Sequence, residues 1–147
     1  MSDLQCPATL VLIRLLPADP VGSVRGLAAP VAGPPRVRFA RLYAGPDDLG
    51  VSCGSVLGDA LGLPVSVLPG LTAPTSGATE ASRGVALEEV IDALADLHRG
   101  ETVLALVPDA LMAVGIGSGG SAAEAPVVTV VVDADGWTVG PGLPAAR

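Results

Sequence analysis

The strongest hydrophobic pattern in the chain is the run Ala8–Leu16, which is apolar apart from Arg14 and one threonine. A continuous apolar run of this kind is typical of a strand that is buried on both faces, as in parallel sheets. It predicts a central strand over Thr9–Arg14. In open α/β sheets, ligands bind outside the carboxyl ends of the strands. The chain is apolar at that point too, because Leu15 and Leu16 follow the arginine.

Shorter apolar runs predict four more strands and the start of a return strand. The four strands are Val37–Ala44, Pro64–Leu68, Thr102–Val107 and Val127–Asp133, and the return begins at Trp137–Val139. The first of these runs alternates polar and apolar residues at its start, so we expect one of its faces to be more exposed to solvent there. The last is rich in valine and leads into a turn at Asp135 and Gly136 without a helix, which favours an edge of the sheet.

Two main helices are predicted between the strands. The first opens with Asp47 and Asp48, because acids are favoured at a helix N-terminus, and it runs to about Leu61, where Gly62 stops it. The second covers Val85–Leu97, and its apolar residues have helical spacing. These stripe residues are Leu87, Val90, Ile91, Leu94 and Leu97.

Three glycines form one smooth face of the first helix, since Gly50, Gly54 and Gly58 are each four residues apart. Each glycine costs a helix roughly 1 kcal/mol relative to alanine. The face is tolerable where the helix lies unusually close to the sheet or to another helix. Core packing is therefore one interpretation, and a seam between two copies of the chain is the other.

The alternation of strands and helices predicts an α/β fold of three layers, with a mostly parallel five-stranded sheet and helices on both faces. We expect one domain over residues 1–147, with loose termini at 1–7 and 140–147. Loops are predicted where Gly, Pro, Ser and Ala accumulate, and they contain two short helical segments. The loops are Asp19–Pro35, Pro69–Gly84 and Gly115–Glu124, and the helical segments are Ser23–Ala29 and Ala110–Val114.

Composition narrows the class of function. Half of the residues are hydrophobic and the mean hydropathy is +0.59, which fits either a core of small residues or an apolar patch covered by a partner. The net charge is −7 and the eight basic residues are scattered arginines, so we expect no nucleic-acid partner. No signal peptide or membrane span is evident, so we expect a cytoplasmic protein and no membrane partner.

The order of the elements, and the motifs at their ends, resembles the histidine phosphatase superfamily, the phosphoglycerate mutase-like proteins. Thr9–Leu16 is similar to the family's first strand, which ends in Arg-His-Gly, and Leu42–Pro46 is similar to its second strand. Gly62–Leu71 resembles the segment that leads to Leu-x-Glu. His98–Asp109 resembles the Gly-Glu-Thr-Val strand that ends in Ser-His-Gly, and Val127–Val139 resembles the closing strand. The resemblance implies a truncated phosphoglycerate mutase-like fold.

The resemblance also implies a chemistry whose residues are missing from this chain. It places the nucleophilic histidine at Leu15, the second histidine at Pro108, the second arginine at about Leu49 and the proton-donating acid at Ala73 or its neighbour. Only the first phosphate-binding arginine is kept, as Arg14. Leucine and proline side chains offer no lone pair, proton or charge. We therefore expect no phosphatase or mutase activity.

Charged residues still follow three of the predicted strands. These are Arg14 after the first strand, Asp47 or Asp48 after the second, and Asp109 after the fourth. Our hypothesis is that Arg14 is neutralised by Asp109 or Asp47, while Leu15 and Pro108 fill the space. The alternative is that the aspartates are helix N-terminal residues and Arg14 faces solvent. Two carboxylates could also act as acid and base or bind a divalent ion.

The other reactive residue types do not form a site. His98 is the only histidine, and we expect it to cap the end of its helix, about 20 Å from the strand ends at ~3.3 Å per residue. Cys53 is expected to be buried and inert because no base lies beside it, and Cys6 to be incidental. Two cysteines and one histidine give no zinc or disulfide pattern, so we expect no metal and no cofactor.

Two classes of function remain. The first is an inactive pseudophosphatase that acts as a protein-interaction, scaffold or regulatory module, either as a homodimer or with another protein. The second is a small-molecule-binding protein or biosynthetic enzyme rebuilt on the fold. Its apolar pocket would be lined by Leu15, Leu49 and Pro108, with Arg14 or Asp109 as the polar ligand-binding group.

Overall fold

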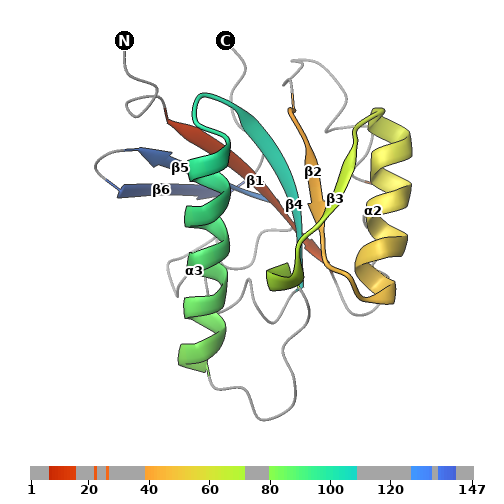
Figure 1. Cartoon of the computed structure of the whole chain (residues 1–147), viewed down its shortest axis with the longest axis horizontal. Helices are drawn as coiled ribbons and strands as arrows, with labels where there is room; N and C mark the ends of the chain where they lie inside the picture. Colours follow the sequence, from red (N-terminus) through yellow and green to blue (C-terminus); the bar gives the residue numbers. More distant parts are fainter. Residues whose placement is uncertain are drawn as a thin grey trace.

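The computed structural model describes residues 7–15, 22, 26, 39–71, 80–108, 127–133 and 136–141, with the backbone alone at 49, 80–86 and 141. These residues form a single sheet with α-helices packed on it (Figure 1). The strands are β1 (Ala8–Leu15), β2 (Leu42–Ala44), β3 (Val65–Val67), β4 (Thr102–Pro108), β5 (Val127–Asp133) and β6 (Gly136–Pro141). The helices are α2 (Asp48–Leu61), the short 3-10 helix η2 (Pro69–Leu71) and α3 (Glu80–Leu97).

The strand order in the sheet is β3-β2-β4-β1-β5-β6. The first four strands are parallel to one another, β5 is antiparallel to β1, and β6 is antiparallel to β5. The predicted fold class, an α/β sheet covered by helices, is confirmed. The sheet has six strands in the described part of the chain rather than five, because the predicted start of a return at Trp137–Val139 lies within the full strand β6.

The β5–β6 hairpin corrects two expectations at the C-terminal end. We expected β5 to be an edge, but β6 pairs with its outer side, and β6 includes Gly140 and Pro141 of the segment expected to be a loose terminus. The physical reason is the turn. Gly136 has a φ of +127°, a conformation that residues with a Cβ atom rarely adopt. Gly136 is paired with Asp133, so β6 runs back along β5 from its first residue.

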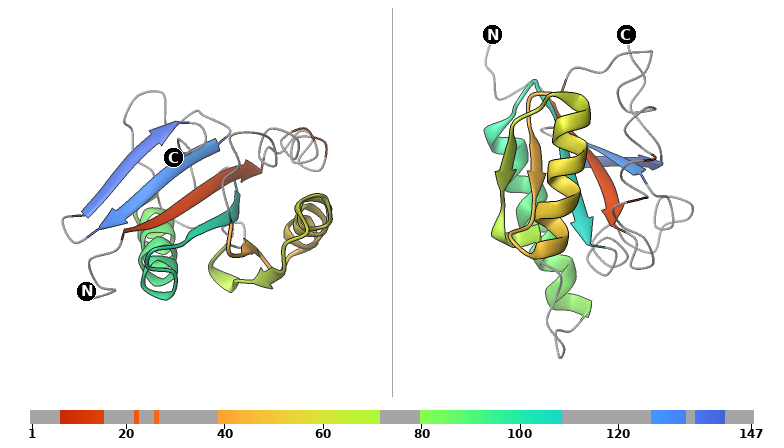
Figure 2. Two further views of the ribbon diagram at one scale, coloured as in Figure 1. Left: turned by 90° about the horizontal axis from the view of Figure 1, so that it is seen from above. Right: turned by 90° about the vertical axis from the view of Figure 1, so that its right-hand side faces the viewer.

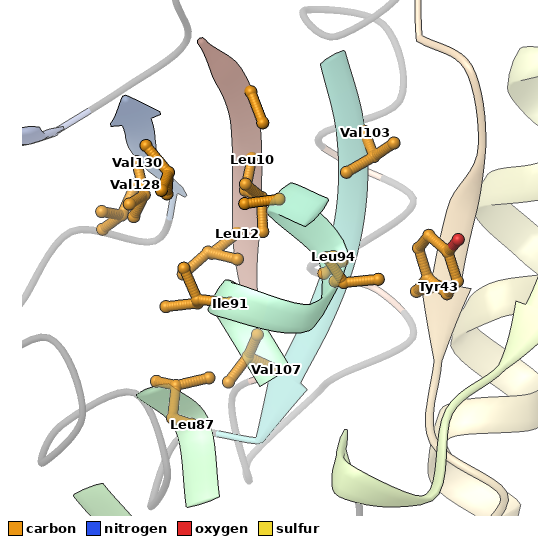
Figure 3. Packing of buried hydrophobic residues seen from close by; sticks show 14 of the residues in the cluster. Leu10, Leu12, Tyr43, Leu87, Ile91, Leu94, Val103, Val107, Val128 and Val130 are labelled. Carbon is orange, nitrogen blue, oxygen red and sulfur yellow. The ribbon is translucent and has the colours of Figure 1, made fainter. Parts of the chain in front are cut away.

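β1 lies in the middle of the sheet and is buried on both faces, as its apolar pattern predicts. Successive side chains of a strand point to opposite faces. Leu10 and Leu12 pack in the cluster that includes α3, shown in Figure 3, whereas Val11 and Ile13 pack in the cluster that includes α2. The two helices therefore cover opposite faces of the sheet (Figure 2).

Helix α2 begins and ends as its sequence predicts. Asp47 is the N-cap, and its side chain accepts a hydrogen bond from the Gly50 N–H at 3.1 Å. Gly62 ends the helix with a φ of +67°. A Cβ at Gly54 would lie 3.1 Å from the Ala44 Cβ, so this face lies against the sheet. The glycine face is core packing and not a seam between two copies.

Two element boundaries differ from the expectation by five residues, and one residue of the predicted stripe is not buried. β2 begins at Leu42, after the predicted start at Val37, and α3 begins at Glu80, before the predicted start at Val85. Leu97, the last residue of the predicted stripe, is 71% exposed, while Leu87 is fully buried. At about 100° per residue, Leu97 lies roughly 80° away from Leu87 around the helix axis, which places it beyond the buried stripe.

Several expectations fall on residues that the structure does not describe. The short helix at Ala110–Val114 lies outside the described residues, and so does Ser23–Ala29 apart from Gly26. The same holds for most of the predicted loops. In the described part of the chain, no helix has both the length and the apolar character that crossing a membrane requires.

Candidate functional site

The carboxyl ends of β1 and β4 meet at one edge of the sheet, as expected for parallel neighbours. Leu15 is paired in register with Pro108, and Arg14 with Val107. Leu15 is 4% exposed and Pro108 is also buried. The two positions that the resemblance assigns to histidines are therefore adjacent in space. Both are occupied by buried apolar side chains.

Arg14 is buried, with 6% of its surface exposed. A buried guanidinium is costly unless it is paired, and Arg14 does interact with another group. The expectation that Arg14 faces solvent is therefore wrong. Asp109 lies outside the described residues. Pairing of Arg14 with Asp109 or Asp47 stays a prediction.

Asp47 and Asp48 lie at the N-terminus of α2. Asp47 caps the helix, and Asp48 lies exposed in the first turn. This is the helix N-terminal role that the alternative assigned to them. Leu49 follows as the next residue of the helix, and its side chain is not described. Ala73, assigned to the missing acid, lies outside the described residues.

Cys53 is fully buried on the inner side of α2, as expected. Burial raises the pKa of the Cys53 thiol above its ordinary value of 9.0, and the negative charge of Asp47 raises it further. A thiol becomes a nucleophile only as the thiolate. Cys53 is thus held in its unreactive form at neutral pH, while Cys6 lies outside the described residues.

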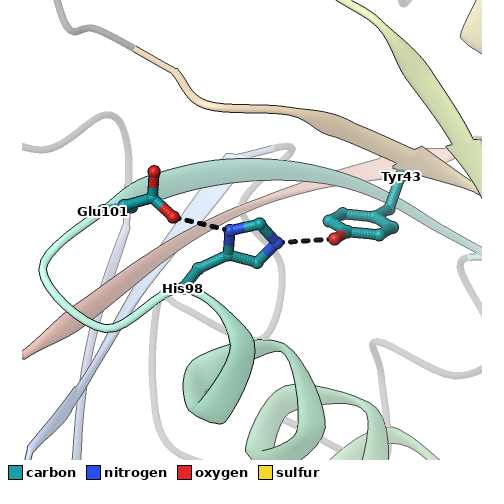
Figure 4. Close-up of polar contacts among 3 residues, drawn as sticks. All are labelled: Tyr43, His98 and Glu101. Atoms are coloured by element: carbon teal, nitrogen blue, oxygen red, sulfur yellow. Dashed lines mark hydrogen bonds and ion pairs between the residues drawn. The ribbon is translucent and has the colours of Figure 1, made fainter. Parts of the chain in front are cut away.

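His98 forms a side-chain network that sequence reasoning missed (Figure 4). Its Nε2 lies 2.5 Å from the Tyr43 hydroxyl oxygen, and its Nδ1 lies 3.0 Å from Glu101 Oε1. We expected the imidazole to bind the last carbonyls of the helix, and that was wrong. The two side chains reach it because α3 ends beside β2 and the following turn places Glu101 three residues after the histidine.

The order carboxylate, imidazole, hydroxyl is the one that activates hydroxyl nucleophiles in enzymes. In this chain the hydroxyl belongs to Tyr43, which is only 7% exposed and packs in the core cluster beside α3. His98 itself is 12% exposed at its side chain. The network therefore connects the end of α3 to β2 and to the start of β4. The spacing of His98 and Glu101 was its only local sequence signal.

A groove of about 260 Å³ lies between α2 and β3, at the edge of the sheet. Most of its wall is apolar, and Ser55 and Asp59 contribute the polar side chains. Three valines on its rim are exposed: Val51 by 53%, Val65 by 41% and Val67 by 57%. The groove combines exposed apolar side chains with β3, which is an edge strand of the sheet in the described part of the chain. Sequence reasoning did not single it out.

The fold is that of the phosphoglycerate mutase-like proteins. YhfR from Bacillus stearothermophilus superposes with a TM-score of 0.71 at 14% identity, over 90% of this chain and 95% of that one. The phosphoglycerate mutase of Plasmodium falciparum gives 0.64 at 8% identity, over 97% of both chains. The protein histidine phosphatase SixA, solved with tungstate, gives 0.60 at 17% identity, over 90% of this chain and 94% of that one.

These similarities concern the fold, because all three identities lie at or below 17%. No protein-family model matches the sequence. No curated protein matches it either.

Proposed function

We propose that this chain is a catalytically inactive member of the histidine phosphatase superfamily that acts by binding another protein chain. One observation carries the proposal: Leu15 and Pro108 are paired at the ends of β1 and β4, and both are buried. These are the positions where the resemblance requires the nucleophilic histidine and its partner. The proposal includes the cytoplasmic location expected from the sequence.

Among the described residues at this edge of the sheet, Leu15 and Pro108 lack the groups that phosphoryl transfer needs. A phosphoryl group is accepted by a lone pair and held by hydrogen-bond donors and positive charge. Aliphatic carbon provides none of these. A phosphate brought against Leu15 and Pro108 would lose its water without gaining partners there, which is unfavourable by several kcal/mol, on the order of the cost of burying an unpaired polar group. Arg14 is kept, but one buried arginine supplies no nucleophile.

The apolar surface beside α2 and β3 supports a binding function. Val51, Val65 and Val67 are exposed on one rim. Contiguous exposed apolar side chains mark interaction sites more often than isolated ones do. The fold would then serve as a stable frame that presents this rim. The partner is a second copy of the chain or another protein.

The test is hydrolysis of p-nitrophenyl phosphate by the purified chain, with Arg14→Lys and Arg14→Ala as comparisons. We expect turnover indistinguishable from buffer for all three proteins. Circular dichroism verifies that the variants are folded, since Arg14 is buried. Turnover by the parent chain that falls at least tenfold in folded Arg14→Lys would overturn the proposal.

A further inference from the structure

A cavity of about 330 Å³ lies beside the amino ends of β2 and β4. Thr102, the first residue of β4, is part of its wall, whereas Pro108 is at the other end of the same strand. The two residues are six positions apart, which is about 20 Å at ~3.3 Å per residue. The cavity is therefore separate from the strand ends that the resemblance assigns to phosphoryl transfer. Its described lining residues are Phe39, Ala40, Gly100, Glu101 and Thr102.

The backbone around this cavity is fixed by hydrogen bonds between the segments that form it. The Ala40 N–H donates to the Thr102 carbonyl at 2.8 Å, which joins the residues before β2 to the first residue of β4. The Thr9 N–H of β1 donates to the Glu101 carbonyl at 3.0 Å. Walls that are already ordered lower the conformational cost of binding a ligand. The cavity is thus a preformed part of the fold.

Glu101 supplies the charge of the cavity, and its carboxylate is held in place. Its Oε1 accepts a hydrogen bond from the His98 Nδ1 at 3.0 Å, because a carboxylate only accepts. The imidazole is fixed from its other side by the Tyr43 hydroxyl (Figure 4). The Glu101 side chain is 51% exposed, and among the described residues its Oε2 has no hydrogen-bond partner. The carboxylate is therefore oriented by the protein and keeps one oxygen for a ligand.

The charges and side chains around the cavity limit which ligand fits. Glu101 is the only charged residue in the described wall, so an anion would be repelled. Divalent metal ions need several protein ligands, and the described part of the chain has no group of three or more His, Cys, Asp or Glu residues that could supply them. Phe39 contributes an aromatic side chain, and the face of such a ring attracts cations. The net charge of −7 also favours cations near the protein, so an organic cation satisfies every condition.

We propose that this cavity binds a small organic ammonium ion, a free primary amine whose apolar part is one ring or a short alkyl chain. Its ammonium group donates to Glu101 Oε2, and its apolar part lies against Phe39 and Ala40. A volume of about 330 Å³ is near the lower end of small-molecule sites, which range over about 300–1,000 Å³. The inference goes beyond the proposed function and does not depend on it, because protein binding was argued from the rim between α2 and β3.

Titration with benzylamine, followed in proton–nitrogen correlation NMR spectra of the full chain, tests the site directly. Benzylamine carries the ammonium group and one ring, and benzyl alcohol has nearly the same shape without the charge. We expect saturable shifts of the amide signals of Gly100, Glu101 and Thr102 with benzylamine. Benzyl alcohol should bind at least tenfold more weakly. No saturable shift with benzylamine, or equal affinity for the two probes, would overturn the proposal.

Glu101→Gln tests whether this residue binds the ammonium group. The substitution keeps an oxygen that can accept from His98 but removes the negative charge, so the variant should stay folded, which the dispersion of its NMR spectrum verifies. The affinity for benzylamine should fall at least tenfold. Glu89→Gln, which removes an exposed charge from α3, is the matched control and should leave the affinity unchanged. Equal affinities of the two variants would overturn the assignment of Glu101.

A third probe separates a free amine from the lysine side chain of another protein. Nα-acetyl-lysine methylamide presents the same ammonium group on a peptide backbone. We expect it to bind more weakly than benzylamine, because its peptide groups would lose water against Phe39 and Ala40 without gaining hydrogen bonds there. Binding of the lysine probe that equals or exceeds that of benzylamine would overturn the assignment to a small molecule.

Discussion

Alanine substitutions on the glycine face of α2 test how closely this helix lies against the sheet. An added Cβ would meet a different neighbour at each position. At Gly54 it would lie 3.1 Å from the Ala44 Cβ. At Gly58 it would lie 2.6 Å from a methyl carbon of Val65, and at Gly50 it would overlap the Gly45 carbonyl oxygen.

The expected effects follow from two opposed terms. Glycine to alanine in a helix gains about 1 kcal/mol when nothing obstructs the methyl group. Overpacking costs typically about 1–3 kcal/mol, and most where the neighbour cannot move. For Gly54→Ala the gain in helix propensity and the cost of overpacking should nearly cancel, so the free energy of unfolding should change little. Gly58→Ala should be neutral or destabilising by up to about 1 kcal/mol, because Val65 is half-exposed and can turn. Gly50→Ala should lower the free energy of unfolding by about 1–2 kcal/mol, because the added methyl group meets the Gly45 backbone, which cannot move aside.

Urea denaturation followed by circular dichroism measures these free energies of unfolding. Ser52→Ala is the matched control, since Ser52 is exposed on the same helix. It should be stabilising by about 0.5 kcal/mol, the difference in helix propensity. If Gly50→Ala were as stable as Ser52→Ala, the close approach of α2 to the β2–α2 turn would be refuted.

Substitutions at three further positions test individual contacts. Tyr43→Phe leaves the His98 Nε2 without its partner and should lower the free energy of unfolding by about 1 kcal/mol; no change on denaturation would mean that the bond adds nothing. Asp47→Ala removes the N-cap and should lower the free energy of unfolding by about 0.5–2 kcal/mol. Asp47→Asn should retain most of the stabilisation that the N-cap provides, because an asparagine side chain also caps helices. Cys53 should react with thiol reagents only as fast as the chain unfolds. Because folding holds its thiol protonated, stability should fall as the pH rises past 9.0, and Cys53→Ala should lack that fall.

The elements that the sequence predicted well are those with strong local signals. β1, β4 and β5 lie in mainly apolar runs, which are typical of buried strands. Helix α2 carries an acid at one end and a glycine with positive φ at the other. The pairing of Leu15 with Pro108 was also predictable, because parallel strands end at the same edge of a sheet.

The features that the sequence did not reveal depend on contacts between distant segments. Tyr43 and His98 are 55 residues apart, and only the folding of α3 onto the sheet brings them together. The place of β3 at the edge of the sheet, as formed by the described residues, depends on the strand order, which periodicity alone does not determine. Leu97 was assigned to the buried stripe because helical spacing does not say how wide the stripe is.

The leucine at the carboxyl end of β1 also contributes to the stability of the sheet. A catalytic imidazole at position 15 would have to be kept polar and solvated at the end of the central strand, and burying it without partners would be costly. Leu15 instead is 4% exposed and packs in the same cluster as Ile13. Full burial of a leucine side chain contributes about 1.5–3 kcal/mol. The carboxyl end of β1 thus extends the core of the sheet.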